Sequence, residues 1–302
     1  MTSFVFPGQG SQFTSMAKDF YDNFKIAKLV FEEIEDYTQL DLKKIIFENK
    51  DNRLNLTQFT QISIFAASYA IYKTYNSENE INNNSNYMLG HSLGEYTALA
   101  CSNKINLKDC SIILKKRGEL MNNAVLPNKT GMAALIGKNC NEIQKIIDEN
   151  NLELEIANDN SNIQIVISGN IEEINKSKNI FINNNVKKFV LLNVSAAFHS
   201  KYMINAQEEL ANEIEKLIFK ENTIKIISNY DANIYNDTNS IKKNLQKQMS
   251  NKVNWTKSIQ KLEETGERKI IEIGPNKVLS GLIRRISNNF DIVSINQISD
   301  LK

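Results

Sequence analysis

The feature that most constrains this chain is the pentapeptide Gly90-His91-Ser92-Leu93-Gly94, which matches the pattern Gly-x-Ser-x-Gly. A short apolar segment, Tyr87-Met88-Leu89, precedes it, and a helical pattern, Tyr96–Cys101, follows it. A serine between a strand and a helix needs a sharp turn to expose its hydroxyl group, and the flanking glycines allow that turn. The helix N-terminus adds free N–H groups that favour a developing oxyanion. The pattern predicts that Ser92 is a nucleophile, the alternative being a serine in an ordinary strand-to-helix turn.

Strands and helices alternate along most of the chain, beginning with a buried strand at Ser3–Pro7. Two long helical patterns follow, Phe20–Tyr37 and Thr57–Tyr75, the second with apolar residues at spacings of three and four. Such alternation predicts a large α/β domain with a mostly parallel sheet that is covered on both faces. Its other helices are expected at Leu107–Asn123, Lys201–Phe219, Ile241–Met249, Thr256–Thr265 and up to Ile286, and its other strands at Lys225–Ser228 and Lys269–Ile273.

A different order of elements occupies residues 127–194. The sequence β-α-β-β-α-β in this stretch is typical of the ferredoxin-like arrangement. It predicts a small subdomain, residues 127–194, inserted into a discontinuous large domain of residues 1–126 and 195–302. The predicted strands are Met132–Ile136, Glu153–Ala157, Ile163–Ser168 and Val186–Val194, and the predicted helices are Asn141–Asn150 and Ile171–Asn183.

Composition excludes several classes of function. The 302 residues carry a formal net charge of +1, so the chain lacks the basic excess of proteins that bind nucleic acid by counterion release. No apolar run approaches the roughly 18 residues that cross a bilayer, and the N-terminus does not resemble a secretory signal. Cys101, Cys110 and Cys140 form no Cys-x-x-Cys pair, and two histidines are too few for a multi-histidine metal centre. We therefore expect a cytoplasmic protein that binds no nucleic acid, membrane or metal.

A nucleophilic serine needs a base, and the chain holds two histidines. His91 is adjacent to Ser92, where neighbouring side chains usually diverge. His199 lies between a predicted strand and a predicted helix, which suits a base carried on a loop, the alternative being a capping or core histidine. Arg117 lies on the second helix after Ser92 and is either a surface cation or a bidentate clamp for a carboxylate.

A series of motifs extends over essentially the whole chain: Phe6–Gln12, Leu56–Gln61, Gly90–Glu95, Arg117-Gly118, Asn160–Gly169, Ala197–Ser200, Gln248–Trp255 and Glu272–Leu282. In this order and spacing they resemble the malonyl-CoA:acyl carrier protein transacylases, whose fold also serves as the acyltransferase domain of fatty acid and polyketide synthases. An ordinary lipase or esterase shares only the serine motif. The resemblance implies an α/β-hydrolase-like large domain that carries the ferredoxin-like subdomain as an insertion.

The resemblance also assigns roles to individual residues. Ser92 is implied to be the nucleophile, and His199 the general base and later the acid. Arg117 is implied to pair with the free carboxylate of a malonyl group. The backbone N–H groups of Gln9 and Leu93 are implied to form the oxyanion hole.

Three further residues are implied to support this site. Gln248 orients His199 through its main-chain carbonyl, in place of the acid of a hydrolase triad. Phe198 narrows the acyl pocket against an α-methyl group, as in malonyl-selective acyltransferases. Asn160 lies at the junction with the small subdomain, or is a surface polar residue in an Asn-rich chain.

The implied reaction transfers a malonyl group from malonyl-CoA to the phosphopantetheine thiol of acyl carrier protein through an O-malonyl-serine. The resemblance further implies a monomer that needs no cofactor and supplies fatty acid synthesis. A stand-alone acyltransferase that loads a polyketide carrier protein shares this chemistry. Two competing interpretations are a thioesterase or carboxylesterase, which would pass the acyl group to water, and a catalytically inactive binding subunit.

Acyl carrier proteins are acidic, so we expect a basic docking face on this chain. Lys187 and Lys188, on the last strand of the small subdomain, are two candidates for it. Arg284 and Arg285, on the final helix, are two more. The alternative is that all four are ordinary solvated charges.

Overall fold

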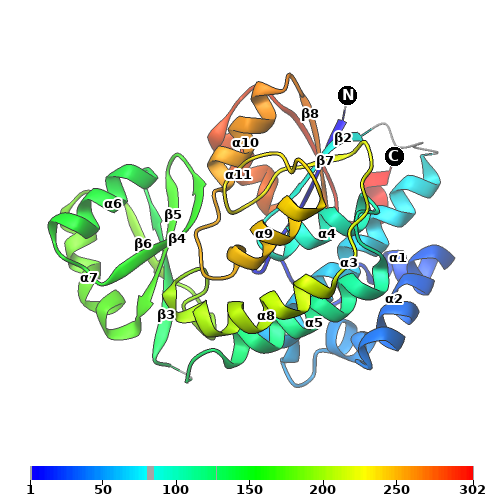
Figure 1. Cartoon of the computed structure of the whole chain (residues 1–302), viewed down its shortest axis with the longest axis horizontal. Helices are drawn as coiled ribbons and strands as arrows, with labels where there is room; N and C mark the ends of the chain where they lie inside the picture. The colour runs from blue at the N-terminus through cyan, green and yellow to red at the C-terminus, as the bar shows by residue number, and fades with distance from the viewer. Residues whose placement is uncertain (1, 80–84, 127, 302) are drawn as a thin grey trace.

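Five parallel strands form the larger of two sheets (Figure 1). The computed structural model describes residues 2–79, 85–126 and 128–301. The strands are β1 (Thr2–Phe6), β2 (Ser85–Gly90), β7 (Lys225–Ile226), β8 (Lys269–Ile273) and β9 (Asp291–Ile295). Their order is β7-β2-β1-β8-β9, and each neighbouring pair is parallel. The predicted parallel sheet is therefore confirmed.

Side chains of the central strand β1 alternate between two hydrophobic cores. Phe4 and Phe6 belong to one core, and Val5 belongs to the core on the opposite face. A strand that is buried on both faces in this way is characteristic of parallel sheets that helices cover on each side. The first core includes residues of α2 (Lys25–Thr38), α3 (Thr57–Glu78), α4 (Leu93–Cys101), α5 (Leu107–Asn123), α8 (Ile204–Lys216) and α9 (Thr238–Gln248), and the second includes residues of α10 (Trp255–Glu264) and α11 (Val278–Ile286).

The second sheet is antiparallel and has the strand order β4-β5-β3-β6. Its elements follow one another as β3 (Thr130–Ile136), α6 (Cys140–Glu149), β4 (Leu154–Ser161), β5 (Gln164–Asn170), α7 (Ile171–Asn183) and β6 (Lys188–Leu191). The predicted β-α-β-β-α-β order is thus present, and a third hydrophobic core lies between this sheet and its two helices. The domain boundaries at 126/127 and 194/195 stay a prediction, and Pro127 lies outside the described residues.

The prediction of one helix over Phe20–Tyr37 is wrong. Two helices occupy this stretch, α1 (Lys18–Asn23) and α2 (Lys25–Thr38). Phe24 separates them with φ of −124° and ψ of 120°, which is an extended conformation. Because no glycine or proline marks this position, the break carries no local signal in the sequence.

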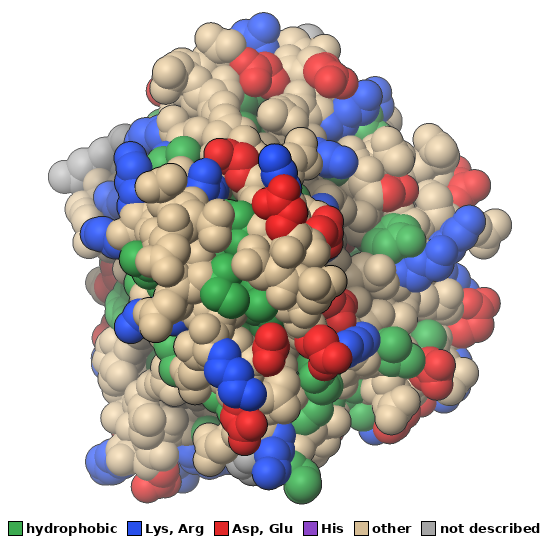
Figure 2. Space-filling view, turned by 90° about the vertical axis from the view of Figure 1, so that its left-hand side faces the viewer, with side chains coloured by type: hydrophobic (Ala, Val, Ile, Leu, Met, Phe, Trp, Pro, Cys, Tyr) green, Lys and Arg blue, Asp and Glu red, His purple; other side chains and the backbone are tan. Residues whose placement is uncertain are grey.

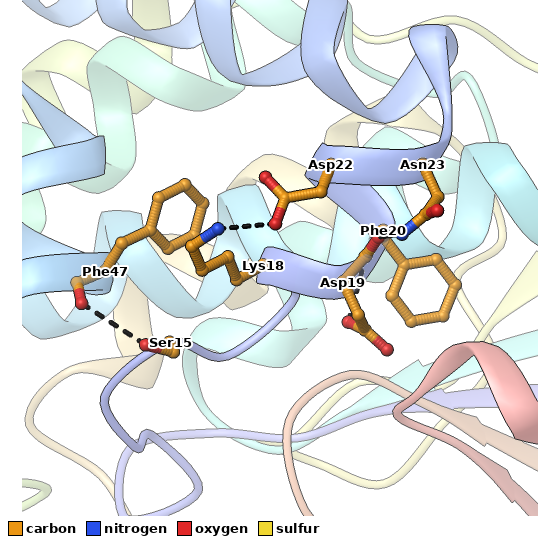
Figure 3. A network of polar contacts seen from close by, with 7 residues as sticks. All are labelled: Ser15, Lys18, Asp19, Phe20, Asp22, Asn23 and Phe47. Atoms are coloured by element: carbon orange, nitrogen blue, oxygen red, sulfur yellow. Dashed lines mark hydrogen bonds and ion pairs between the residues drawn. The ribbon is translucent and has the colours of Figure 1, made fainter.

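Polar contacts lie within and around α1 (Figure 3). Lys18 forms an ion pair with Asp22, one turn along the helix. The Asp19 carboxylate accepts hydrogen bonds from the N–H groups of Phe20 at 2.9 Å and of Ile298 at 2.8 Å. Because Ile298 belongs to the C-terminal segment, Asp19 ties the first helix to the last residues of the chain.

The remaining differences lie at the ends of elements and in one strand that was not predicted. β6 covers Lys188–Leu191, so it begins later and ends earlier than the predicted strand Val186–Val194. The helix predicted from Lys201 begins with a 3-10 turn, Lys201–Met203, and α8 ends at Lys216. β9 has no counterpart among the predicted strands, since its exposed and half-buried residues give a weak apolar signal.

The two sheets meet where β4 packs against α10 and α11. Asn158 on β4 forms a bridge with Val253, and the Thr256 hydroxyl donates to the Asp159 carboxylate at 2.6 Å. Figure 2 views the end of the molecule formed by the antiparallel sheet and its helices, where acidic and basic side chains are interspersed. Within residues 2–79, 85–126 and 128–301, no helix is long and apolar enough to span a membrane.

Candidate active site

Ser92 occupies a tight turn between β2 and α4. Its φ is +53° and its ψ is −109°, a combination of backbone angles that residues other than glycine rarely adopt. The turn presses the start of α4 against β1. A Cβ atom on Gly94 would lie 2.1 Å from the carbonyl oxygen of Phe6, and one on Gly90 would lie 1.9 Å from Gly94. Both glycines are therefore required for the close approach that exposes the serine hydroxyl to the site.

The Ser92 hydroxyl oxygen lies 2.9 Å from Nε2 of His199. The other ring nitrogen, Nδ1, lies 3.0 Å from the carbonyl oxygen of Gln248 and 3.2 Å from that of Asn251. Because carbonyl oxygens only accept hydrogen bonds, Nδ1 carries the proton and Nε2 is free to accept the serine proton. Two main-chain carbonyls thus occupy the place next to Nδ1 that a carboxylate takes in a hydrolase triad.

His199 is 5% exposed and its environment favours the neutral ring. Burial is the main cause, and the positive charge of Arg117 is the second. Together they lower the pKa of His199 to about 3. The imidazole is therefore in its basic form at neutral pH.

Arg117 is a buried cation, 1% exposed, and it touches the Ser92 hydroxyl. One guanidinium nitrogen, Nη1, donates to the Gln61 side-chain oxygen at 2.6 Å. The other, Nη2, donates to the Gln248 side-chain oxygen at 2.9 Å and to the Ser92 hydroxyl at 3.0 Å. Its Nε has no hydrogen-bond partner, and no carboxylate among the described residues lies within ion-pair distance. A buried guanidinium that no carboxylate contacts directly favours an anionic ligand.

These groups open into a cavity of about 90 Å³. Its small volume suits a short acyl group. Both sheets contribute to the wall, since Met132 lies on β3 and Leu192 and Val194 follow β6 of the antiparallel sheet, while the turn after β2 comes from the parallel sheet. The other lining residues are Gln9, Gln61, His91, Ser92, Leu93, Arg117, Met121, Asn158, Phe198 and His199.

Two backbone N–H groups beside the cavity can receive an oxyanion. Leu93 is the first residue of α4, so its N–H has no partner within the helix. Gln9 lines the same cavity, and its side chain donates to the Thr57 hydroxyl at 3.2 Å. The N–H of Ser92 is already occupied, because it donates to the Asn229 side-chain oxygen at 2.6 Å.

Comparison with known proteins agrees with this geometry. The family model described as the acyl transferase domain matches residues 3–296. The chain belongs to the acyl transferase domain family. The family resemblance seen in the motifs is thereby confirmed.

Several relatives of this acyl transferase are matched over nearly their whole lengths. The malonyl CoA-acyl carrier protein transacylase of Bacillus subtilis (strain 168) is 34% identical over 97% of the chain and 92% of that protein. The polyketide biosynthesis malonyl CoA-acyl carrier protein transacylase PksC of the same organism is 38% identical, over 96% and 98%. The malonyl CoA-acyl carrier protein transacylase structure from Coxiella burnetii superposes with a TM-score of 0.95, at 32% identity and 99% and 95% coverage. A malonyl-transacylase in complex with a type II PKS acyl-carrier protein gives 0.94, at 31% identity and 99% and 97% coverage.

Not every predicted residue of this acyl transferase lines the cavity. Phe198 does, and its carbonyl accepts from the Ser168 hydroxyl at 2.6 Å. Asn160 instead binds Nε2 of His91 at 2.8 Å at the junction of the two sheets. That ring also packs against Trp255, and burial lowers the pKa of His91.

The four predicted docking residues are exposed and lie outside the cavity wall. Lys188 is the first residue of β6, and Lys187 precedes it. Arg284 and Arg285 are in the last turn of α11, where Arg285 donates to the Gln164 side chain at 2.7 Å. Their part in docking stays a prediction.

Sequence reasoning missed several residues of the site. Gln61 and Glu95 belong to recognised motifs, yet neither was given a role. Asn158 and Asn229 lie in a chain rich in asparagine, so their residue type carried no signal. Contacts between distant segments bring both of them to the site.

Across the described ranges, no three His, Cys, Asp or Glu side chains come together as a metal site requires.

Proposed function

We propose that this acyl transferase moves a malonyl group from malonyl-CoA to the phosphopantetheine thiol of an acyl carrier protein, through an O-malonyl-serine at Ser92. The observation that carries the proposal is the buried guanidinium of Arg117, which touches the serine hydroxyl and has no carboxylate partner among the described residues. A dicarboxylic acyl group supplies the missing negative charge. The names of the relatives support the same substrates.

In the first half-reaction, the Ser92 oxygen attacks the thioester carbonyl while its proton passes to Nε2 of His199. The resulting imidazolium is stabilised by the two carbonyls that accept from Nδ1. The developing oxyanion lies against the N–H groups of Gln9 and Leu93. The thioester C–S bond then breaks, His199 returns the proton to the CoA sulfur, and the malonyl group stays on Ser92.

The second half-reaction repeats these steps in reverse with a different thiol. The pantetheine thiol of the carrier protein gives its proton to His199 and attacks the ester carbonyl. The ester C–O bond breaks, and His199 restores the proton to the Ser92 oxygen. The chemistry is ping-pong and needs no group beyond the two substrates and these side chains.

Partner docking and location complete the proposal. Lys187, Lys188, Arg284 and Arg285 offer positive charge for an acidic carrier protein. The cytoplasm suits a chain whose Cys101 and Cys110 are buried free thiols. We assign the product to fatty acid synthesis, and the 38% identity to PksC keeps a polyketide carrier protein as the second candidate.

Intact-protein mass spectrometry after brief mixing with malonyl-CoA, followed by peptide mapping, tests the proposal. We expect a malonyl adduct on the peptide that contains Ser92, discharged by holo acyl carrier protein and absent in Ser92→Ala. Free CoA without an adduct indicates a hydrolase. If neither an adduct nor free CoA forms, malonyl-CoA is not the substrate. Rates of discharge by a fatty acid and a polyketide carrier protein, compared at equal concentration, separate the two pathways.

A further inference from the structure

Asn229 spans the turn that carries the nucleophile. Its side-chain oxygen accepts from the N–H of Ser92 at 2.6 Å, and its side-chain nitrogen donates to the carbonyl of Gly90 at 2.7 Å. One carboxamide thus holds the residue on each side of His91. The side chain is fully buried, so both hydrogen bonds are shielded from water.

The backbone of Asn229 is itself fixed by neighbours. Its N–H donates to the Glu95 carboxylate at 3.3 Å, and its carbonyl accepts from the N–H of Asn254 at 2.9 Å. Asn229 follows the edge strand β7, whereas Ser92 follows β2, the strand beside it. The carboxamide therefore reaches the turn from a separate, anchored segment.

We propose that Asn229 is a positioning residue that holds Ser92 in its strained conformation with the hydroxyl aimed at His199. The carboxamide fits the bond pattern, because the turn presents one N–H and one carbonyl and an amide holds an acceptor for the first and a donor for the second. Asn229 neither lines the cavity nor contacts the Ser92 hydroxyl, so it acts through the backbone.

Without this clamp, the N–H of Ser92 and the carbonyl of Gly90 lose their partner, and the turn loses a restraint on the positive φ of Ser92. The hydroxyl then leaves the 2.9 Å contact with His199 and the neighbourhood of the oxyanion donors. Arg117 keeps its contacts with Gln61 and Gln248, so recognition of the acyl carboxylate persists. The loss therefore falls on the acylation rate and spares substrate affinity.

The inference rests on the proposed role of Ser92, so its test uses a probe that needs no malonyl substrate. A fluorophosphonate forms a bond from its phosphorus to the Ser92 oxygen, expels fluoride and leaves the serine proton on His199. Labelling of Ser92 in the unaltered protein establishes the nucleophile. Failure of that labelling overturns the role of Ser92, and not of Asn229 alone.

The variant Asn229→Ala removes both hydrogen bonds. We expect labelling and kcat for malonyl transfer to fall by about 100-fold, with KM for malonyl-CoA unchanged within about twofold. The matched control is Asn233→Ala, an exposed asparagine of the same loop whose bond to Ser228 is made by the main chain. It should label at the unaltered rate.

Thermal unfolding shows whether each variant is folded at the assay temperature. If Asn229→Ala is unfolded, Asn229→Leu replaces it, because leucine keeps the branched shape and lacks both polar groups. A folded variant that labels and turns over at the unaltered rate overturns the inference. If kcat/KM falls by the expected factor but only because KM rises, the inference is also overturned, because that result indicates a binding defect.

Discussion

The carbonyl oxygen of Gln248 lies 3.0 Å from Nδ1 of His199, while the side chain of the same residue binds the cation of the site. The side-chain oxygen of Gln248 accepts from Arg117, and its nitrogen donates to the Glu95 carboxylate at 2.5 Å. One residue thus contacts the base through its backbone and the guanidinium through its side chain. Substituting the side chain separates the two contacts.

Gln248→Ala should weaken recognition of the acyl carboxylate and leave the base intact. A hydrogen bond to a charged group contributes about 1.5–3 kcal/mol, so we expect kcat/KM for malonyl-CoA to fall at least about tenfold. The acid limb of the pH profile should not move, because the main-chain carbonyl remains. Steady-state kinetics across pH check this, with Gln246→Ala on the same helix as control. A shifted acid limb would show that the side chain also tunes His199.

Arg117→Ala should reverse the preference between acyl groups. A buried carboxylate without its partner costs about 3–5 kcal/mol, which corresponds to a loss of at least about 100-fold in kcat/KM for malonyl-CoA. Acetyl-CoA carries no such charge and should be tolerated better by the variant. Arg117→Lys keeps the positive charge but not the bidentate guanidinium group, so it should recover part of the malonyl activity. Unchanged malonyl kinetics in the alanine variant contradict the clamp.

The reactivity of Ser92 should persist far into the acid range. The pKa of His199 is lowered to about 3, so the ring loses its basic form only as the pH falls towards that value. The rate of fluorophosphonate labelling should therefore show no drop near pH 6.5, the usual pKa of histidine. Because Arg117 is the second cause of the shift, the acid limb should move upward in Arg117→Ala. A limb near 6.5 in the unaltered protein contradicts this account.

Glu95 should make the fold less stable as the pH rises. Burial raises its pKa from 4.5 to about 7, so the folded state binds this proton more tightly than the unfolded state does. The free energy of unfolding therefore falls between pH 4.5 and 7, by about 3 kcal/mol in total from this group. Urea unfolding at pH 5 and 8 should show a smaller decrease in Glu95→Gln than in the unaltered protein. Glu264→Gln, at an exposed position of α10, is the control and should behave as the unaltered chain does.

Charge reversal at the predicted docking residues should affect one substrate only. We expect Lys188→Glu and Arg285→Glu to raise KM for the carrier protein severalfold, with malonyl-CoA kinetics unchanged, because neither residue lines the cavity. The increase should shrink at high salt. Lys25→Glu on α2, which lies towards the opposite end of the molecule in Figure 1, is the control. Equal losses for both substrates argue against a docking role.

The sequence was most informative where chemistry and backbone shape demand the same residues. Glycines 90 and 94 flank Ser92 because the turn tolerates no Cβ there, and this rigid pattern predicts strand, turn and helix together. The alternation of strands and helices likewise predicted the parallel sheet and the inserted antiparallel one. Ser92, His199 and Arg117 were singled out by motif and spacing, and the structure brings their side chains into contact.

What escaped prediction depends on contacts between distant parts of the chain. Asn229 is 137 residues from Ser92, and nothing near it in the sequence marks a partner of the turn. The break at Phe24 is marked by no glycine or proline, and the hydrogen bond between Asp19 of α1 and Ile298 joins segments far apart in the sequence. Gln61 meets Arg117 across two packed helices, α3 and α5, which no local pattern encodes.

The two carbonyls that orient His199 have a consequence for which acceptor the acyl group reaches. A carboxylate in their place would strengthen the base, whereas the neutral carbonyls only partly offset burial and the charge of Arg117, so the pKa of His199 stays low. A weak base removes a proton far more readily from a thiol, with a pKa near 8.5, than from water, with a pKa near 15.7. The acyl-enzyme should therefore survive in water until a thiol arrives, so that little malonyl is lost to hydrolysis between the two half-reactions.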